Sequence, residues 1–202
     1  MTVTGLRKRL APLTTRVNAR AYAGHAVGVD AHGWLHKAYT RPSGRGRRKQ
    51  SNAAKINRNG ARNGGRRVSA PRRYWGARKE GIEDRDELAA RCASFVRTRV
   101  EILQRIDVRC VLVFDGRAPA SKRAFKKKTR GDREDDAPQD WLPACAAAAE
   151  RAGTSAGATS IRAPCESDAQ LAFLARRGDI CAAITEDADL VCFGCPRVLF
   201  GA

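Results

Sequence analysis

Three short apolar runs in this chain lead into an aspartate. Ala26–Asp30 reads AVGVD, Cys110–Asp115 reads CVLVFD, and Cys181–Ile184 is followed closely by Asp187. Apolar runs of this length, bounded by turn-forming residues, indicate buried strands. One aspartate at a strand end carries little information, because turns favour aspartate. Three such strand ends in one chain indicate a shared site.

The segments between these runs have helical patterns. Helices are expected over residues 86–106, over Trp141–Arg151, and from Glu166 to Gly178. In the first of them, apolar residues recur at spacings of three and four, which gives one apolar face: Leu88, Cys92, Phe95, Val96, Val100 and Leu103. Strands that alternate with helices predict an α/β fold, with a mostly parallel central sheet flanked by helices on both faces.

A few further elements are expected outside this alternation. A short basic helix is predicted from Leu6 to Leu10, broken by Pro12, and a last apolar strand from Pro196 to Phe200. Ligands of parallel α/β sheets bind beyond the carboxyl ends of the strands. The aspartates at the three strand ends fall at this edge.

More carboxylates accompany the strand ends. Glu166 and Asp168 open a predicted helix, and Asp189 follows Asp187. Crowded carboxylates raise one another's pKa unless a cation lies between them, and Mg²⁺ or Mn²⁺ prefers oxygen ligands. The alternative is that these acids serve a helix N-terminus and a loop. The three strand ends favour a metal site, in which two ions about 4 Å apart would act on a phosphodiester. Glu186 should point away from Asp187 in an extended segment.

The positive charge is unevenly distributed. The net charge is +18, and residues 41–79 contribute fourteen Lys and Arg without any Asp or Glu, which leaves +4 for the remainder. This Arg-, Gly- and Asn-rich stretch cannot bury enough apolar surface to fold alone, so we expect a disordered basic insertion. It could contact a nucleic acid backbone, with Tyr74 and Trp75 as stacking groups, or be a solvated linker or wrongly translated sequence. A polyanionic partner is expected.

Membrane insertion and secretion are not expected. No run approaches the roughly 18 apolar residues of a membrane span, and the first ten residues lack the apolar stretch of a signal peptide. The composition therefore favours a soluble intracellular protein.

Three segments carry a family resemblance: VGVDAHGWLHKA (27–38), VLVFDGRAPASKR (111–123) and APCESDAQLAFLARRGDICAAITEDADLVCFGC (163–195). The chain resembles the flap endonuclease and exonuclease 1 family of structure-specific 5′ nucleases, and looks closest to eukaryotic exonuclease 1. The resemblance implies a PIN-like 5′ nuclease fold. It also implies cleavage of 5′ DNA flaps or 5′→3′ removal of nucleotides from duplex ends and nicks. Six acids would then ligate two Mg²⁺ ions, with Mn²⁺ as a substitute: Asp30, Asp115, Glu166, Asp168, Asp187 and Asp189.

The resemblance further implies a DNA-binding set. Lys122 matches a basic residue that contacts the scissile phosphate, where it would offset transition-state charge. His36 falls where the family places a ring that stacks on the substrate. The remaining basic residues would grip the DNA backbone, although as a charge run they could equally be a solvated face: Arg123, Lys126, Lys127, Lys128 and Arg130. The expected partners are DNA and proteins of repair or replication, in the nucleus, without a stable oligomer.

The chain also departs from the family pattern. Thr2 stands where the family has glycine, Thr129 stands where it usually has arginine, and the segment between Asp115 and Glu166 looks shortened. The sequence stops at Ala202, before the family's seventh acid and its K⁺-binding helix-two-turn-helix element. We therefore expect an N-terminal nuclease region at 1–40, the basic insertion at 41–80, a nuclease region with the start of a basic arch at 81–130, and an incomplete internal region at 131–202.

Three functions follow as hypotheses. The first is a Mg²⁺-dependent 5′ nuclease, and the second is a catalytically impaired DNA-binding relative. The third is a basic RNA-binding protein that acts through residues 41–79.

Overall fold

The computed structural model describes residues 5–40, 85–117 and 141–201. The predicted insertion at 41–80 lies outside these ranges. So do the basic residues that were assigned to the DNA backbone and the scissile phosphate, from Lys122 to Arg130.

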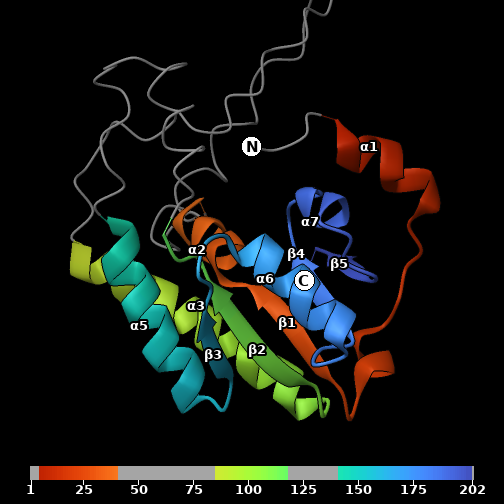
Figure 1. Cartoon of the computed structure of the whole chain (residues 1–202). Coiled ribbons are helices and arrows are strands. Elements are labelled where there is room, and N and C mark those ends of the chain that lie inside the picture. The colour runs from red at the N-terminus through yellow and green to blue at the C-terminus, as the bar shows by residue number, and fades with distance from the viewer. Residues whose placement is uncertain (1–4, 41–84, 118–140, 202) are drawn as a thin grey trace, which may run out of the picture. The chain divides into compact units, whose positions relative to one another are not determined.

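The centre of the fold is a five-stranded sheet in which every neighbouring pair is parallel, with strand order β3-β2-β1-β4-β5 (Figure 1). The predicted α/β fold with a parallel central sheet is confirmed. The strands are β1 (Ala26–Asp30), β2 (Arg109–Phe114), β3 (Thr159–Arg162), β4 (Ala182–Thr185) and β5 (Val198–Phe200).

The three central strands end almost level with one another. Asp30 at the end of β1 is in register with Val113 of β2, and Val29 is in register with Ile184 of β4. Strands that follow β1 in the chain lie on both sides of it, so the order reverses there. Such a reversal is where parallel α/β sheets form ligand sites.

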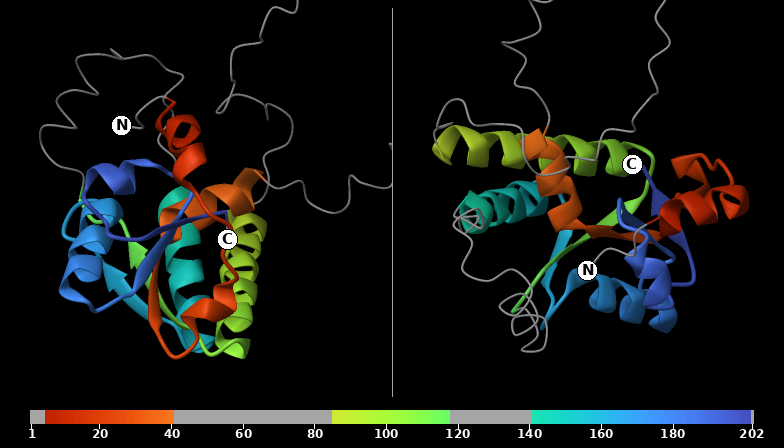
Figure 2. Two further views of the ribbon diagram at one scale, coloured as in Figure 1. Left: turned by 90° about the vertical axis from the view of Figure 1, so that its right-hand side faces the viewer. Right: turned by 90° about the horizontal axis from the view of Figure 1, so that it is seen from above.

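Helices cover both faces of the sheet (Figures 1 and 2). One face carries α2 (Ala31–Thr40), α3 (Arg85–Arg105) and α5 (Trp141–Ser155). Here the apolar stripe of α3 packs with the sheet in one core cluster, together with Leu112, Phe114 and Cys145. The other face carries α6 (Ser167–Arg177), whose Leu171 packs with Val113 and Ala183. Gly178 ends α6 in the left-handed conformation, as its position in the sequence predicted.

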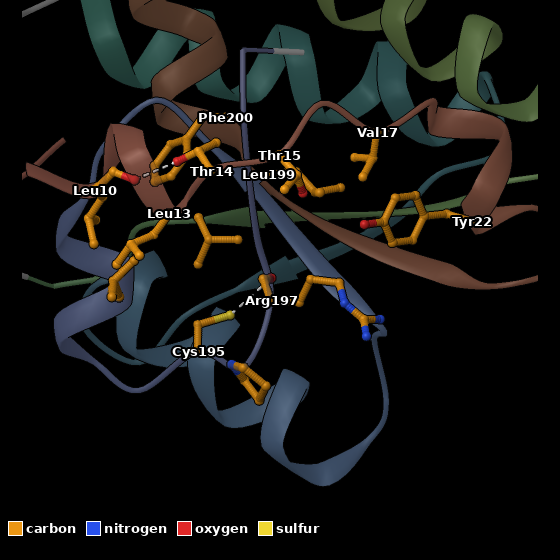
Figure 3. Close-up of a pocket in the computed structure, with 13 residues that line it drawn as sticks. Leu10, Leu13, Thr14, Thr15, Val17, Tyr22, Cys195, Arg197, Leu199 and Phe200 are labelled. Atoms are coloured by element: carbon orange, nitrogen blue, oxygen red, sulfur yellow. Dashed lines mark hydrogen bonds between the residues drawn. The ribbon is translucent and has the colours of Figure 1, made fainter. Parts of the chain in front are cut away.

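The N-terminal segment lies beside the β5 edge of the sheet. It contains α1 (Leu6–Leu10), directly followed by a short 3-10 turn that includes Pro12. Between this segment and β5 is an open pocket of about 350 Å³, lined by residues such as Leu13, Tyr22 and Phe200 (Figure 3). No predicted site residue lines this pocket, and Arg197 is its only charged lining residue.

The sequence patterns did not predict strand β3 or the short helix α7. Strand β3 reads TSIR, and its residues are half-buried or exposed because it lies at the sheet edge. Its polar composition therefore hides it from a search for apolar runs. The second element is α7 (Asp189–Cys192), a single turn that starts at a residue expected in a loop. Among the described helices, none is long and apolar enough to cross a membrane.

Two glycines allow close approach of chain segments near the site. A Cβ at Gly116 would lie 1.9 Å from the carbonyl oxygen of Ala163, in the connection between β3 and α6. A Cβ at Gly28 in β1 would lie 2.5 Å from the Ile180 side chain and 2.6 Å from that of Leu171. The first contact is with backbone, whereas the second is with the ends of side chains that can shift.

We therefore expect Gly116→Ala to destabilise the protein more than Gly28→Ala does. Overpacking against side chains costs about 1–3 kcal/mol, and Gly116→Ala should exceed that range because the backbone itself must move. Thermal unfolding of the two variants beside the parent chain measures the order. An equal or smaller loss for Gly116→Ala would contradict the packing described at the end of β2.

Candidate metal centre

Asp30 is the buried centre of the acidic group. It ends β1, and its Oδ1 accepts a hydrogen bond from the Gly33 N–H at 3.1 Å, which caps the start of α2. Its Oδ2 accepts from the Thr185 hydroxyl at 3.2 Å. Burial raises the pKa of Asp30, and the Asp115 charge raises it further against the opposing effect of these hydrogen bonds. Gly33 must remain small, because a Cβ there would lie 2.7 Å from Asp30 Oδ2.

Asp115 joins the end of β2 to the start of α6. Its Oδ1 accepts from the Ser167 N–H at 2.7 Å, and its own N–H donates to His32 Nδ1 at 3.1 Å. The His32 Nδ1 also lies 3.7 Å from Asp115 Oδ2. Because Nδ1 accepts the backbone N–H, the proton of a neutral His32 ring belongs on Nε2. Gly116 adds a second hydrogen bond between the end of β2 and the segment before α6, because its N–H donates to the Cys165 carbonyl.

The pKa of Asp168 indicates how closely the acids are gathered. It lies in the first turn of α6, and its pKa is raised to about 7. Burial is the largest cause, followed by the charges of four other aspartates: Asp30, Asp187, Asp115 and Asp189. Carboxylates from three strand ends and one helix start therefore share an electrostatic neighbourhood, as the sequence predicted.

Asp187 and Asp189 are held by a tight turn after β4. The Asp187 N–H donates to the Thr185 hydroxyl at 3.1 Å, and Asp187 Oδ1 accepts from the Asp189 N–H at 3.2 Å. The Asp189 side chain is buried. Thr185 thus links this turn to Asp30, because its hydroxyl donates to the Asp30 carboxylate and accepts from the Asp187 N–H.

Glu186 lies in a bend directly after β4 rather than in the extended segment that the sequence predicted. Its carboxylate forms ion pairs with Lys37 of α2 at 2.5 Å and with Arg7 of α1 at 3.5 Å. The turn after β4 is therefore tied to the first two helices of the chain.

Glu166 directly precedes α6 in extended conformation, and its side chain does not cap that helix. Glu166 is the N-cap residue and Asp168 lies in the first turn, so both acids also occupy the helix N-terminus that the alternative assigned to them. Its half-buried position beside Ser167 leaves it next to the Asp115 join.

The donor set suits a hard divalent cation. All six predicted ligands are carboxylates, the type of donor that Mg²⁺ and Mn²⁺ prefer. Within residues 5–40, 85–117 and 141–201, no three side chains of His, Cys, Asp or Glu approach closely enough to hold an ion as they stand. Instead, backbone N–H groups and the Thr185 hydroxyl donate to the carboxylates of Asp30 and Asp115.

His36 lies one turn into α2 and is half-buried. Its ring packs edge-on against Trp141 of α5 with ring centroids 5.7 Å apart. Burial lowers its pKa, as does the nearby His32, whereas Asp115 opposes this shift. His36 is therefore within electrostatic reach of the acids.

Three residues of the site were not identified from the sequence: His32, Ser167 and Thr185. Each contacts an aspartate that is more than fifty positions away in the sequence. Serine and threonine beside acids are common in loops, so no local pattern marks them. Only the parallel register shows what they contact.

Known proteins match this chain in sequence. Residues 157–201 match the family described as XPG I-region. Exonuclease 1 of Danio rerio is 27% identical over 98% of this chain and 23% of that protein. Flap endonuclease 1 of Pyrococcus abyssi is 31% identical over 48% of this chain and 34% of that protein. The chain thus spans about a quarter to a third of the length of these relatives.

The fold has solved counterparts. Human GEN1 in complex with Holliday junction DNA matches with a TM-score of 0.65 at 16% identity, over 98% of this chain and 40% of that one. A GEN1 complex with product DNA and Mg²⁺ matches with a TM-score of 0.52 at 17% identity, over 98% of this chain and 36% of that one. The resemblance to the flap endonuclease and exonuclease 1 family is confirmed.

Asp168→Asn should stabilise the protein when metal is chelated. The folded-state pKa of about 7 lies above the ordinary value of 3.8, so the folded protein gains stability from this group only at low pH and loses it as the pH rises toward 7 and beyond. The uncharged amide removes that loss. Near pH 8 we expect a gain of about 1 kcal/mol, a rise in Tm of about 2–4 °C.

The gain should shrink as the pH falls toward about 4, where the parent carboxyl is protonated too. Thermal unfolding at several pH values in EDTA measures it. Asp179→Asn is the matched control, because Asp179 forms an ion pair with Arg177 rather than facing the acids. A Tm loss for Asp168→Asn near pH 8 would contradict the shared acidic neighbourhood.

Thr185→Val should weaken divalent metal binding. It removes the hydroxyl that orients both Asp30 and the Asp187 turn while keeping the side-chain volume. Residues that orient metal ligands typically contribute about 10–100-fold to metal affinity. Titration with Mn²⁺ measures this. Thr98→Val is the control, because the Thr98 hydroxyl bonds only the Ser94 carbonyl of its own helix. Equal affinities in the two variants would exclude an orienting role for Thr185.

Proposed function

Because the chain is related to the flap endonuclease and exonuclease 1 family, we propose that it is a Mg²⁺-dependent, structure-specific 5′ nuclease that acts on DNA. Its activity would be that of a 5′→3′ exodeoxyribonuclease and 5′-flap endonuclease in repair, replication or recombination. The expected location is the nucleus. The expected partners are DNA and repair or replication proteins, with the chain acting as a monomer.

One observation carries the proposal. The charges of four aspartates, which come from the ends of β1, β2 and β4, raise the pKa of a fifth at the start of α6. A fold gains nothing in stability from gathering acids in this way, so the arrangement indicates a function. Relatives that carry names of nucleases cover nearly the whole chain in sequence, which supports the reading. The GEN1 structure with product DNA and Mg²⁺ supports the choice of ion.

The six acids would hold two Mg²⁺ ions, with Mn²⁺ as a substitute: Asp30, Asp115, Glu166, Asp168, Asp187 and Asp189. When bound, such ions polarise phosphodiester oxygens and lower the pKa of water. The chain's own residues prepare the site. His32 and Ser167 orient Asp115, and Thr185 orients Asp30. Partial burial of the acids would strengthen their attraction for the divalent ions.

The proposal also assigns substrate contacts. Lys122 would contact the scissile phosphate, and His36 would stack on the substrate near the cut. The DNA backbone would be held by Arg123, Lys126, Lys127, Lys128 and Arg130. Contacts to the backbone position DNA without reading sequence. Selectivity should therefore come from the shape of the DNA and its free 5′ end.

Cleavage of a 5′-flap or nicked DNA duplex in the presence of Mg²⁺ tests the proposal. We expect Asp187→Asn to lower the rate by more than roughly a hundredfold, because even residues that only orient metal ligands contribute about 10–100-fold. Asp179→Asn provides the control, as it changes an exposed acid outside the cluster by the same chemistry. Cleavage that Asp187→Asn leaves unchanged would refute the metal assignment.

Other results would select the alternative functions. Salt-dependent DNA binding without cleavage would identify a catalytically impaired relative. RNA binding that is lost when residues 41–79 are deleted, without preference for a DNA flap, would identify a basic RNA-binding protein.

A further inference from the structure

Tyr39, Trp141 and His36 form an aromatic platform where α2 and α5 meet. The rings of Tyr39 and Trp141 stack with centroids 4.7 Å apart and planes 5° apart. The His36 ring packs edge-on against the same Trp141 ring, with centroids 5.7 Å apart. Parallel stacking at this distance holds the Tyr39 ring in a defined plane.

Packing against the core explains the position of Trp141 but not that of Tyr39, which is exposed. Trp141 is half-buried and packs against the core cluster beneath α2, α3 and α5. The Tyr39 residue is 36% exposed. Trp141 covers one face of the Tyr39 ring. Arg91 of α3 donates to the Tyr39 carbonyl at 3.2 Å at the end of α2. Among the described residues no other ring stacks on Tyr39, so the ring face opposite Trp141 is the one open to a further stack.

The platform lies at a set distance from the acids. Helix α2 starts directly after Asp30, and Tyr39 is nine positions farther along the chain. With a helical rise of about 1.5 Å per residue, Tyr39 is roughly 13 Å from Asp30 along the helix. Stacked nucleotides advance about 3.4 Å per step. The platform is therefore about three to four nucleotides from the acidic group.

We propose that the open face of Tyr39 stacks on an unpaired base of single-stranded DNA that passes the acidic group. This inference rests on the proposed function and adds a substrate contact to it. An exposed aromatic face accepts any base, because every base has a π-face. A flap or frayed 5′ end supplies such bases, whereas a continuous duplex keeps them paired and stacked on one another. The platform therefore favours substrates with an unpaired segment near the cut.

The test measures the energetic coupling between Tyr39 and one nucleotide. Every protein carries Asp187→Asn so that DNA stays intact in Mg²⁺. The affinity for a 5′-flap duplex is measured with Tyr, Leu or Phe at position 39, and with abasic nucleotides placed singly at successive flap positions. Loss of one base–aromatic stack costs about 1–3 kcal/mol, so Tyr39→Leu should weaken binding roughly five- to 150-fold. Tyr39→Phe should restore binding.

Abasic DNA supplies the second arm. At one position, about three to four nucleotides from the cut, the abasic site should weaken binding to the parent protein by a similar factor and leave the affinity of Tyr39→Leu unchanged. Phe173→Ala is the matched control, since Phe173 is 44% exposed on α6, over the opposite face of the sheet. It should bind like the parent at every position.

The outcomes separate this inference from the proposed function. If the chain with Asp187 intact cleaves flap DNA but Tyr39→Leu loses no affinity, or loses it equally for intact and abasic DNA, the platform does not bind a base and the nuclease stands. If the chain neither binds nor cleaves flap DNA, both proposals are wrong. Circular dichroism of Tyr39→Leu shows whether the variant is folded. If it is not, the abasic series decides with the parent protein alone, and equal affinity at every flap position would refute the stack.

Discussion

Mutual repulsion of carboxylates at one edge of the sheet is the constraint on which the rest of the structure depends. Asp30 is buried and Asp168 has a pKa of about 7, so the protein keeps acids where their charge is unfavourable. Backbone N–H groups and hydroxyls partly compensate for this cost. Gly33 and Gly116 give the space that these contacts need, because a Cβ at either position would collide with the arrangement.

Helices on the two faces of the sheet supply different residues at this edge. The α6 face supplies Glu166 and Asp168 at the start of a helix, and the α2 face supplies His32, His36 and the aromatic platform. Both helices begin at the carboxyl edge of the sheet, so their first turns reach the acids from opposite sides (Figure 1). The ion pairs of Glu186 with Lys37 and Arg7 then fix the turn after β4 to the N-terminal helices.

At this site the gathered acids lower stability, as charged and buried groups at functional sites commonly do. Proteins tend to violate local rules of charge and burial at functional sites and compensate elsewhere. Here the compensation is a well-packed α/β core, in which both faces of β1 are covered by apolar side chains. The pocket beside β5 shows that concavity alone is a poor guide to the chemistry, because none of the acids lines it.

The sequence by itself determined the features that local patterns encode. Apolar runs predicted β1, β2 and β4, helical periodicity predicted α3, and Gly178 predicted the end of α6. The aspartates at the strand ends predicted where the acids gather, because parallel strands share one carboxyl edge. Strand β3 was missed because an edge strand needs no apolar run.

Only the tertiary structure decided which groups touch. The hydrogen bond from Thr185 to Asp30 joins residues 155 positions apart, and that from Asp115 to His32 joins residues 83 positions apart. The stack of Tyr39 on Trp141 likewise joins two helices that are distant in the chain. Such pairs depend on the register of strands and the packing of helices, which arise from burial summed over the whole core. No short stretch of sequence carries that information.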